Sequence, residues 1–221
     1  MKNKFLLLIF LFVSTSLFSQ EYVWSVYNIK VDRVNAGQVV SAMDNYLSKP
    51  GNLVDGVTVS LFEIMFASDD VEATHVIAFT GDPDAMNAMY SAGQNDEWQV
   101  MMGTFDQLTE SKGSAAGRSI HTFNMEGEGP IHHILQLNVD DPGKYAPAFK
   151  KMWTTIKPDN RLTLGQFISG RSDGVSHYIL AANDDFKDLV TRREWNAKER
   201  AAWQTYSCLL YTSPSPRDLS T

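Results

Sequence analysis

The chain has 221 residues with 26 acidic against 19 basic side chains, and its net charge of −7 makes nucleic acid and anionic membrane surfaces poor partners. Its one cysteine, Cys208, stands near the end, so thiol catalysis, disulfides and a cysteine-ligated metal are excluded from the sequence before it. About 190 residues are enough to bury a core without cross-links. We therefore expect hydrophobic burial alone to stabilise the fold.

Residues 1–19 have the layout of a secretory signal peptide. Lys2 and Lys4 precede an apolar run over residues 5–13, and small residues follow it. The run is shorter than the roughly 20 residues that a membrane-spanning helix needs. We expect an exported protein, periplasmic or extracellular, that begins near Gln20 and has no membrane contact after cleavage; an uncleaved anchor is the alternative.

Apolar periodicity then predicts strands and helices in succession. Asp82 followed by Pro83 is typical of a helix N-terminus. Residues 113–117 are rich in glycine and serine, and we expect a flexible loop there. The expected strands are 22–31, 57–67, 74–80 and 118–125, and the expected helices are 36–47, one that starts at 83, and 97–108.

The second half of the chain repeats the first. Val26–Asp32 (VYNIKVD) recurs as Ile134–Asp140 (ILQLNVD), and the strand that begins near His75 recurs near His177. Such an internal duplication predicts two copies of one structural unit. The expected strands of the second copy are 131–139, 162–169 and 176–182, and its expected helices are 144–156, 186–191 and 198–206.

The order of elements is that of the ferredoxin-like βαββαβ unit. Two such units in tandem, at 20–126 and 131–207, resemble the dimeric α/β-barrel superfamily. The resemblance implies an α+β fold in which the two tandem units form an intramolecular α/β barrel, with two sheets face to face and the helices outside. The superfamily includes small monooxygenases, isomerases and haem-binding enzymes such as chlorite dismutases, and fold alone does not choose among them.

The last residues differ in character from the rest. Residues 208–218 resemble, residue for residue, the translation of a transposase-type sequencing adapter. We therefore expect 208–221 to be an artefact and the second unit to be truncated before its last strand, near Ser207. A natural tail rich in serine and proline is the alternative.

One face of the first strand is mixed in character in both copies. Trp24, Asn28 and Lys30 alternate with apolar residues, and His132 and Gln136 hold corresponding positions in the second copy. A polar and aromatic strand face fits the lining of a cavity between sheets better than a dry core. Trp24, Asn28, Lys30 and Gln136 are therefore predicted to bind the ligand.

Two further candidates lie on the second strand of each copy, Glu63 and Gln166. If both point inward, Gln166 joins the ligand-binding set, and burial raises the pKa of Glu63 and suits it to general-base catalysis. His132 is the other candidate catalytic base. The alternative is that Glu63 faces solvent or pairs with Lys30.

The histidines do not form a pattern of metal ligands. His132 and His133 are adjacent in a predicted strand, so their side chains point to opposite faces. His75 and His177 are equivalent positions of the repeat, which favours a structural role. We therefore predict no metal site and no cofactor; in a haem-binding barrel His132 would be the first candidate ligand.

The sequence thus predicts an exported protein, monomer or homodimer, that binds a small, partly apolar molecule in a cavity between its two sheets. Three alternatives stay open. One is an enzyme similar to cofactor-independent monooxygenases or isomerases, in which Glu63 or His132 is the base and Asn28 or Gln136 polarises a carbonyl. The others are a haem-binding barrel and an interaction module.

Overall fold

The computed structural model describes residues 22–92, 95–171, 174–191 and 193–210. The predicted signal peptide and residues 211–221 lie outside this part of the chain. Among the described residues, no helix is long and apolar enough to cross a membrane.

The first unit has the order βαββαβ, with two helices in the second helical position. The 3₁₀ turn η1 (Arg33–Asn35) precedes the first α-helix. The N-terminus of α2 is capped as predicted, because the Asp82 carboxylate accepts the N–H groups of Asp84 and Ala85. The elements are β1 (Val23–Val31), α1 (Ala36–Leu47), β2 (Val57–Glu63), β3 (His75–Gly81), α2 (Pro83–Ser91), α3 (Asp96–Leu108) and β4 (Thr109–Phe123).

The second unit repeats this order up to its last helix, and α6 extends through residues 208–210. The elements are β5 (Ile131–Leu137), α4 (Pro142–Ile156), β6 (Leu162–Ser169), β7 (His177–Asn183), α5 (Phe186–Val190) and α6 (Ala197–Leu210).

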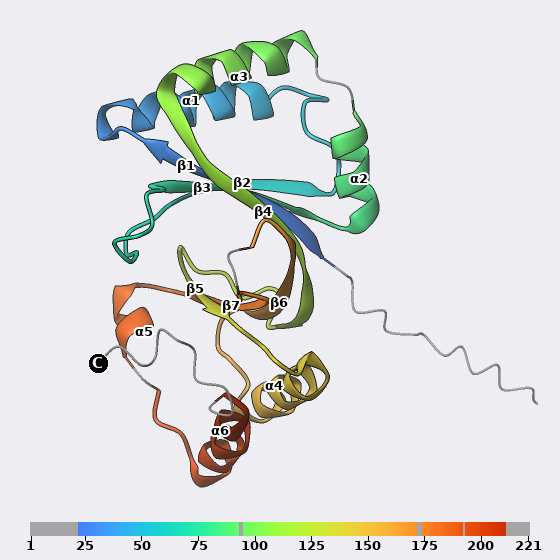
Figure 1. The fold of residues 1–221 in the computed structure, drawn as a ribbon, viewed down its shortest axis with the longest axis vertical. Coiled ribbons are helices and arrows are strands. Elements are labelled where there is room, and N and C mark those ends of the chain that lie inside the picture. The colour runs from blue at the N-terminus through green and yellow to red at the C-terminus, as the bar shows by residue number, and fades with distance from the viewer. Residues whose placement is uncertain (1–21, 93–94, 172–173, 192, 211–221) are drawn as a thin grey trace, which may run out of the picture.

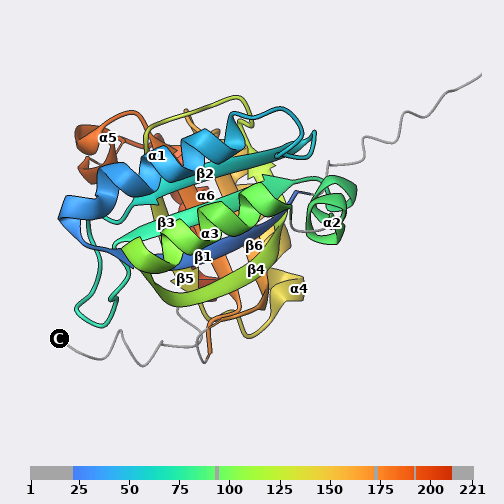
Figure 2. The ribbon, with the colours of Figure 1, turned by 90° about the horizontal axis from the view of Figure 1, so that it is seen from above.

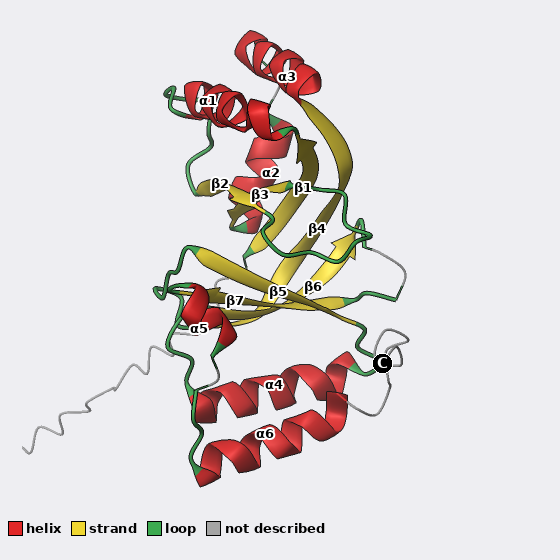
Figure 3. Cartoon of the chain, turned by 90° about the vertical axis from the view of Figure 1, so that its left-hand side faces the viewer, coloured by secondary structure: helices red, strands yellow, loops and turns green. Residues whose placement is uncertain are grey.

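All seven strands of the described residues form one antiparallel sheet in the order β2-β3-β1-β4-β6-β7-β5. The sheet curls so that its two halves face each other (Figure 1). Helices α1 and α3 cover the outside of one half, and α4 and α6 cover the outside of the other (Figure 3). The prediction of an α+β fold with two tandem ferredoxin-like units is confirmed.

Strand β4 joins the two units, because β1 pairs with one of its edges and β6 with the other. The expectation of a loop at 113–117 is wrong, since β4 already begins at Thr109. Gly113 has a φ of 106° at a β-bulge, where the register of β4 against β1 shifts between Tyr27 and Ile29. Glycine, serine and alanine have weak strand propensity, so pairing with β1, and at Ala116 and Gly117 also with β6, makes this segment a strand rather than local preference.

Each half of the sheet buries one face under its own helices. In the first unit Ile29 and Val31 of β1 pack against Val39 and Met43 of α1 and Phe105 of α3. The residues between them along β1 therefore point to the other face. The equivalent core of the second unit is more aromatic. It contains Tyr145, Phe149, Met152, Ile156, Leu162, Leu164 and Tyr206.

A hydroxyl and a histidine tie the end of the first strand to the start of the third in both units. In the first unit the Thr74 hydroxyl accepts the N–H of Val31 at 2.9 Å and lies 2.9 Å from Nδ1 of His75. In the second unit the Ser176 hydroxyl accepts the equivalent N–H at 3.0 Å and lies 2.8 Å from Nδ1 of His177. The contacts give His75 and His177 the same structural role.

Burial of His177 makes the stability of the fold depend on pH. The side chain is 1% exposed, and burial, with a smaller effect of Arg171, lowers the pKa of His177 below the ordinary value of 6.5. The unfolded chain therefore takes up a proton at a higher pH than the folded one. The free energy of unfolding should have its full value above pH 6.5 and should fall as the pH drops below 6.5. Urea denaturation at pH 7.5 and pH 5.5 measures this difference.

The variant His177→Gln should show a smaller loss of stability between the two pH values. Burial also lowers the pKa values of His121 and His132, so the pH dependence should shrink rather than vanish. The exposed His133 supplies the control, His133→Gln. Equal pH dependence in wild type and His177→Gln would contradict the prediction.

Candidate functional site

Three of the predicted ligand-binding residues lie on the inner face of the first unit. Because Ile29 and Val31 are buried under the helices, Trp24, Asn28 and Lys30 point toward the second unit. Asn28 is half-buried at the β-bulge, and Lys30 is exposed at the end of β1. The same alternation in β5 puts His132 and Gln136 on the inner face of the second unit, since Leu137 packs against that unit's core.

Trp24 contacts two aromatic side chains of the second unit. Its ring meets those of Phe167 in β6 and Tyr178 in β7 edge-on, with centroids 5.4 and 5.3 Å apart. Phe167 and Tyr178 are themselves 5.4 Å apart. Edge-to-face contacts at these distances are the favoured geometry of aromatic pairs. We call these three residues the aromatic triangle.

Two glycines let the rings of the aromatic triangle lie directly on the sheet. Gly117 stands opposite Trp24 in the pairing of β4 with β1, and Gly165 stands opposite Tyr178 in the pairing of β6 with β7. A Cβ at position 117 would come within 2.4 Å of the Trp24 ring, and one at 165 within 2.1 Å of the Tyr178 ring. Any side chain at either position would therefore displace a ring.

The polar atoms of the aromatic triangle are enclosed. Burial raises the pKa of Tyr178 to about 12, against a smaller opposite effect of the Ser119 hydroxyl, so the phenol stays protonated. The Trp24 indole N–H is buried close to Tyr178 but meets no acceptor in hydrogen-bonding geometry among the described residues. A buried donor without a partner costs free energy, and an acceptor on a bound molecule would recover it.

His132 lies at the other end of the inner faces, against Phe62 of β2. The two ring centroids are 4.7 Å apart, with 43° between the ring planes. Burial and the positive charge of Arg161 lower the pKa of His132, although a hydrogen bond to the backbone of Gly129 opposes them. The imidazole is therefore neutral at neutral pH, the form that can accept a proton.

Glu63 and Gln166 do not lie with the other candidates. Val59 and Leu61 of β2 pack against the core under the helices, so the strand alternation puts Glu63 on that side, where it is exposed. Gln166 pairs with the buried His177 on the helix-covered face, and its side chain accepts a hydrogen bond from Arg118 at 3.3 Å. The expectation that Glu63 and Gln166 point inward is therefore corrected.

The described residues contain no group of three or more histidine, cysteine, aspartate or glutamate side chains placed to hold a metal ion. His132 is half-buried on the inner face, whereas His133 is exposed and points to the opposite face of β5.

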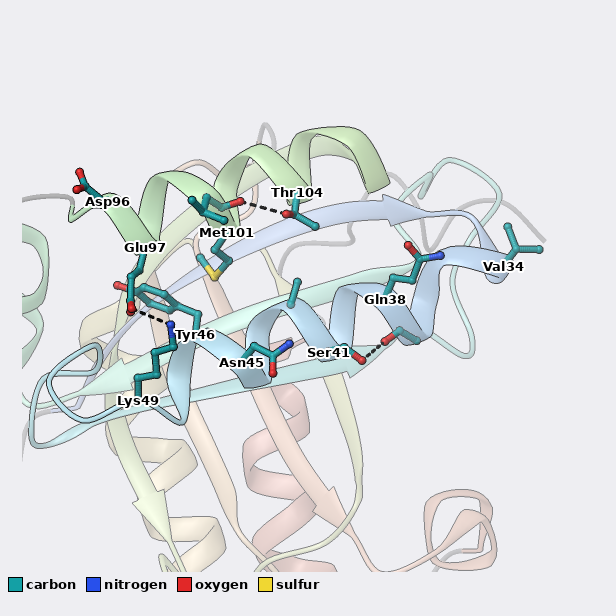
Figure 4. Close-up of a pocket in the computed structure, with 13 residues that line it drawn as sticks. Val34, Gln38, Ser41, Asn45, Tyr46, Lys49, Asp96, Glu97, Met101 and Thr104 are labelled. Atoms are coloured by element: carbon teal, nitrogen blue, oxygen red, sulfur yellow. Dashed lines mark hydrogen bonds and ion pairs between the residues drawn. The ribbon is translucent and has the colours of Figure 1, made fainter.

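A groove of about 850 Å³ lies elsewhere, on the outside of the first unit between α1 and α3, and sequence reasoning did not predict it. The two helices run side by side across the outer face of the strands (Figure 2). Lys49 and Glu97, whose charged atoms are 2.7 Å apart, bridge the groove, and Tyr46 lies beside them (Figure 4). Lys49 and Glu97 neutralise each other at this end of the groove, and Asp96 also lines it.

The aromatic triangle can be tested through its glycines. Gly165→Ala should lower the free energy of unfolding by about 1–3 kcal/mol, because the new methyl group overpacks the Tyr178 ring. Gly103→Ala is the control: this glycine lies in α3 with nothing within 4 Å of a new Cβ, and alanine should stabilise the helix by up to ~1 kcal/mol. Urea denaturation of both variants measures the effects, and equal stabilities would contradict the packing described here.

No protein-family model matches the chain, and no curated protein sequence matches it significantly. Solved structures do match. A candidate monooxygenase from Fusobacterium nucleatum is 16% identical and aligns over 86% of this chain and 88% of its own, with a TM-score of 0.56. One from Lactobacillus acidophilus is 11% identical over 86% of this chain and 90% of its own, with a TM-score of 0.56.

An anthrone oxidase-like protein is 10% identical over 90% of both chains, with a TM-score of 0.52. At these identities the likeness concerns the fold alone. The likeness supports the fold described above, two tandem ferredoxin-like units, and shows no specific family.

Proposed function

We propose that this protein binds a small, partly apolar molecule between the inner faces of its two half-sheets, next to the aromatic triangle. The observation that carries the proposal is the buried Trp24 N–H, whose neighbour, the Tyr178 hydroxyl, lies outside good hydrogen-bonding geometry. Such a donor in an aromatic setting favours a flat molecule with a carbonyl or similar acceptor. Gln136 stands opposite Tyr178 in the pairing of β5 with β7, so its exposed amide could hold a second polar group of the molecule.

Anthrone, a flat aromatic ketone, is a suitable probe, and isothermal titration calorimetry measures its binding. Trp24→Phe keeps an aromatic ring but removes the N–H donor, and it should weaken binding about fivefold, as the loss of about 1 kcal/mol of hydrogen bonding predicts. Gln136→Ala should have an effect of similar size. Lys49→Ala, in the outer groove, is the control and should bind as wild type does. Equal dissociation constants in all four proteins would contradict this site.

A second function, an enzyme similar to cofactor-independent monooxygenases or isomerases, is supported by His132. A neutral imidazole on the inner face is suited to take a proton from a carbon whose anion a carbonyl stabilises by conjugation, such as the CH2 group of anthrone across the ring from its carbonyl. The names of the structural neighbours, candidate monooxygenases and an anthrone oxidase-like protein, are in keeping with this reaction.

Turnover of anthrone in air, followed by mass spectrometry, tests the enzymatic function. His132→Gln should lower kcat at least a hundredfold if His132 is the general base, whereas the exposed His133→Gln should retain activity. Full activity of His132→Gln would remove His132 from the reaction. No turnover by wild type would reject this reaction for anthrone and leave the binding proposal to the calorimetry.

We also propose that residues 1–19 direct export, on the sequence pattern alone. Mass spectrometry of the mature protein from the periplasm or the medium should give a chain that begins near Gln20. A chain that keeps Met1 and stays with the cytoplasmic fraction would contradict export.

A further inference from the structure

Strand β5 has one paired and one open edge among the described residues. It ends the sheet, next to β7. Its equivalent in the first unit, β1, pairs on both sides, with β3 and with β4. Ile134 and Leu135 of β5 are 52% and 47% exposed. Exposed apolar side chains on both faces of an edge strand indicate a missing neighbour.

Hydrogen bonds show which backbone groups of β5 face the open edge. The carbonyl oxygen of Leu137 accepts the N–H of Ser176, and that of Ile131 accepts the side-chain amide of Asn183, both on the β7 side. In an antiparallel strand, alternate residues direct both backbone groups to the same side. The N–H and C=O groups of the intervening residues therefore point to the open edge. These residues are His132, Ile134 and Gln136.

In β1 the same alternation directs the equivalent groups to β4, because the carbonyl oxygen of Tyr22 accepts the N–H of Ser119 at 2.8 Å. The open edge of β5 thus presents the groups that β1 uses to bind β4.

We propose that the open edge of β5 accepts an eighth strand, antiparallel and equivalent to β4, which the natural chain supplies directly after α6. The connectivity of the first unit carries the choice of occupant. There β4 follows α3 without a loop, since α3 ends at Leu108 and β4 begins at Thr109. Helix α6 packs beside α4 as α3 packs beside α1, so a strand after α6 starts from the corresponding place.

Residues 211–221 do not suit this role. The segment reads YTSPSPRDLST, with Pro214 and Pro216 in alternate positions and few apolar side chains to cover Ile134 and Leu135. Its residues up to 218 belong to the stretch that resembles a translated adapter. The proposed strand therefore replaces residues 208–221 and does not consist of them.

The repeat also gives the register of the eighth strand. Thr109 pairs with Val31, and Ala115 pairs with Val26. The equivalents of Val31 and Val26 are Val139 and Ile134, so the new strand should begin opposite Val139 and run back toward Ile131. Its inward side chains would then flank His132 and Gln136 and complete that side of the inner face. The strand itself does not depend on the ligand proposed above.

Hydrogen exchange measured by NMR tests the proposal with two chains. One has the 221 residues given, and the other has residues 208–221 replaced by the sequence that the source gene encodes after Ser207. The amides of Ile134 and Gln136 should exchange at least tenfold more slowly in the second chain. The amide of Leu135, which points to β7 in both chains, is the internal control and should change little. Gln136→Pro removes one outward donor and should weaken the protection of Ile134 in the second chain only.

Three results would overturn the proposal. The replaced chain could leave the amides of Ile134 and Gln136 as fast as in the given chain. The given chain could protect these amides in a concentration-dependent manner, which would make a second copy the occupant. The source gene could encode residues 208–221 as they stand, in which case no such strand follows α6.

Discussion

The structure depends on the double pairing of β4. Because one strand binds β1 along one edge and β6 along the other, two units that each bury one face under their own helices form one curled sheet. The β-bulge at Gly113 and the register shifts against β6 give β4 the irregularities that accompany bending of a strand. This bend turns the uncovered face of each unit toward the other, so every inner-face residue discussed above owes its position to it.

Because the uncovered faces of the two units meet, bulky aromatic rings must fit between the two half-sheets. Trp24 and Tyr178 fit because each lies over a glycine on the neighbouring strand, Gly117 and Gly165. Glycine is unfavourable in a strand on its own, and here the packing of an aromatic ring offsets that cost. Glycine in β4 thus both weakens the strand propensity of that segment and allows the two units to come into close contact.

The sequence predicted those features of the structure that local residue patterns determine. The helix at 36–47 was predicted to the residue, and alternation assigned Trp24 and His132 to the inner face, because each strand has apolar residues at every second position. Glu63 follows the alternative stated for it and faces solvent, because Val59 and Leu61 of β2 pack under the helices and the strand alternation puts Glu63 on their side. The aromatic triangle was not predicted, since contacts across two units depend on the bend of β4 and on no local pattern.

A comparison of the two repeated units shows which contacts are the same in both and which differ. The hydroxyl and histidine contacts at Thr74 and Ser176 are the same in both units, as expected of groups that hold strand ends. Trp24 and His132 are also equivalent positions, and each contacts the opposite unit, but one lies in an aromatic cluster and the other is an imidazole against the single ring of Phe62. Identical contacts stabilise the fold twice, whereas a binding site for an asymmetric molecule needs two different ends. In the proposed function, the inner face near Trp24 receives the flat ring and the carbonyl of such a molecule, and the imidazole of His132 takes its proton.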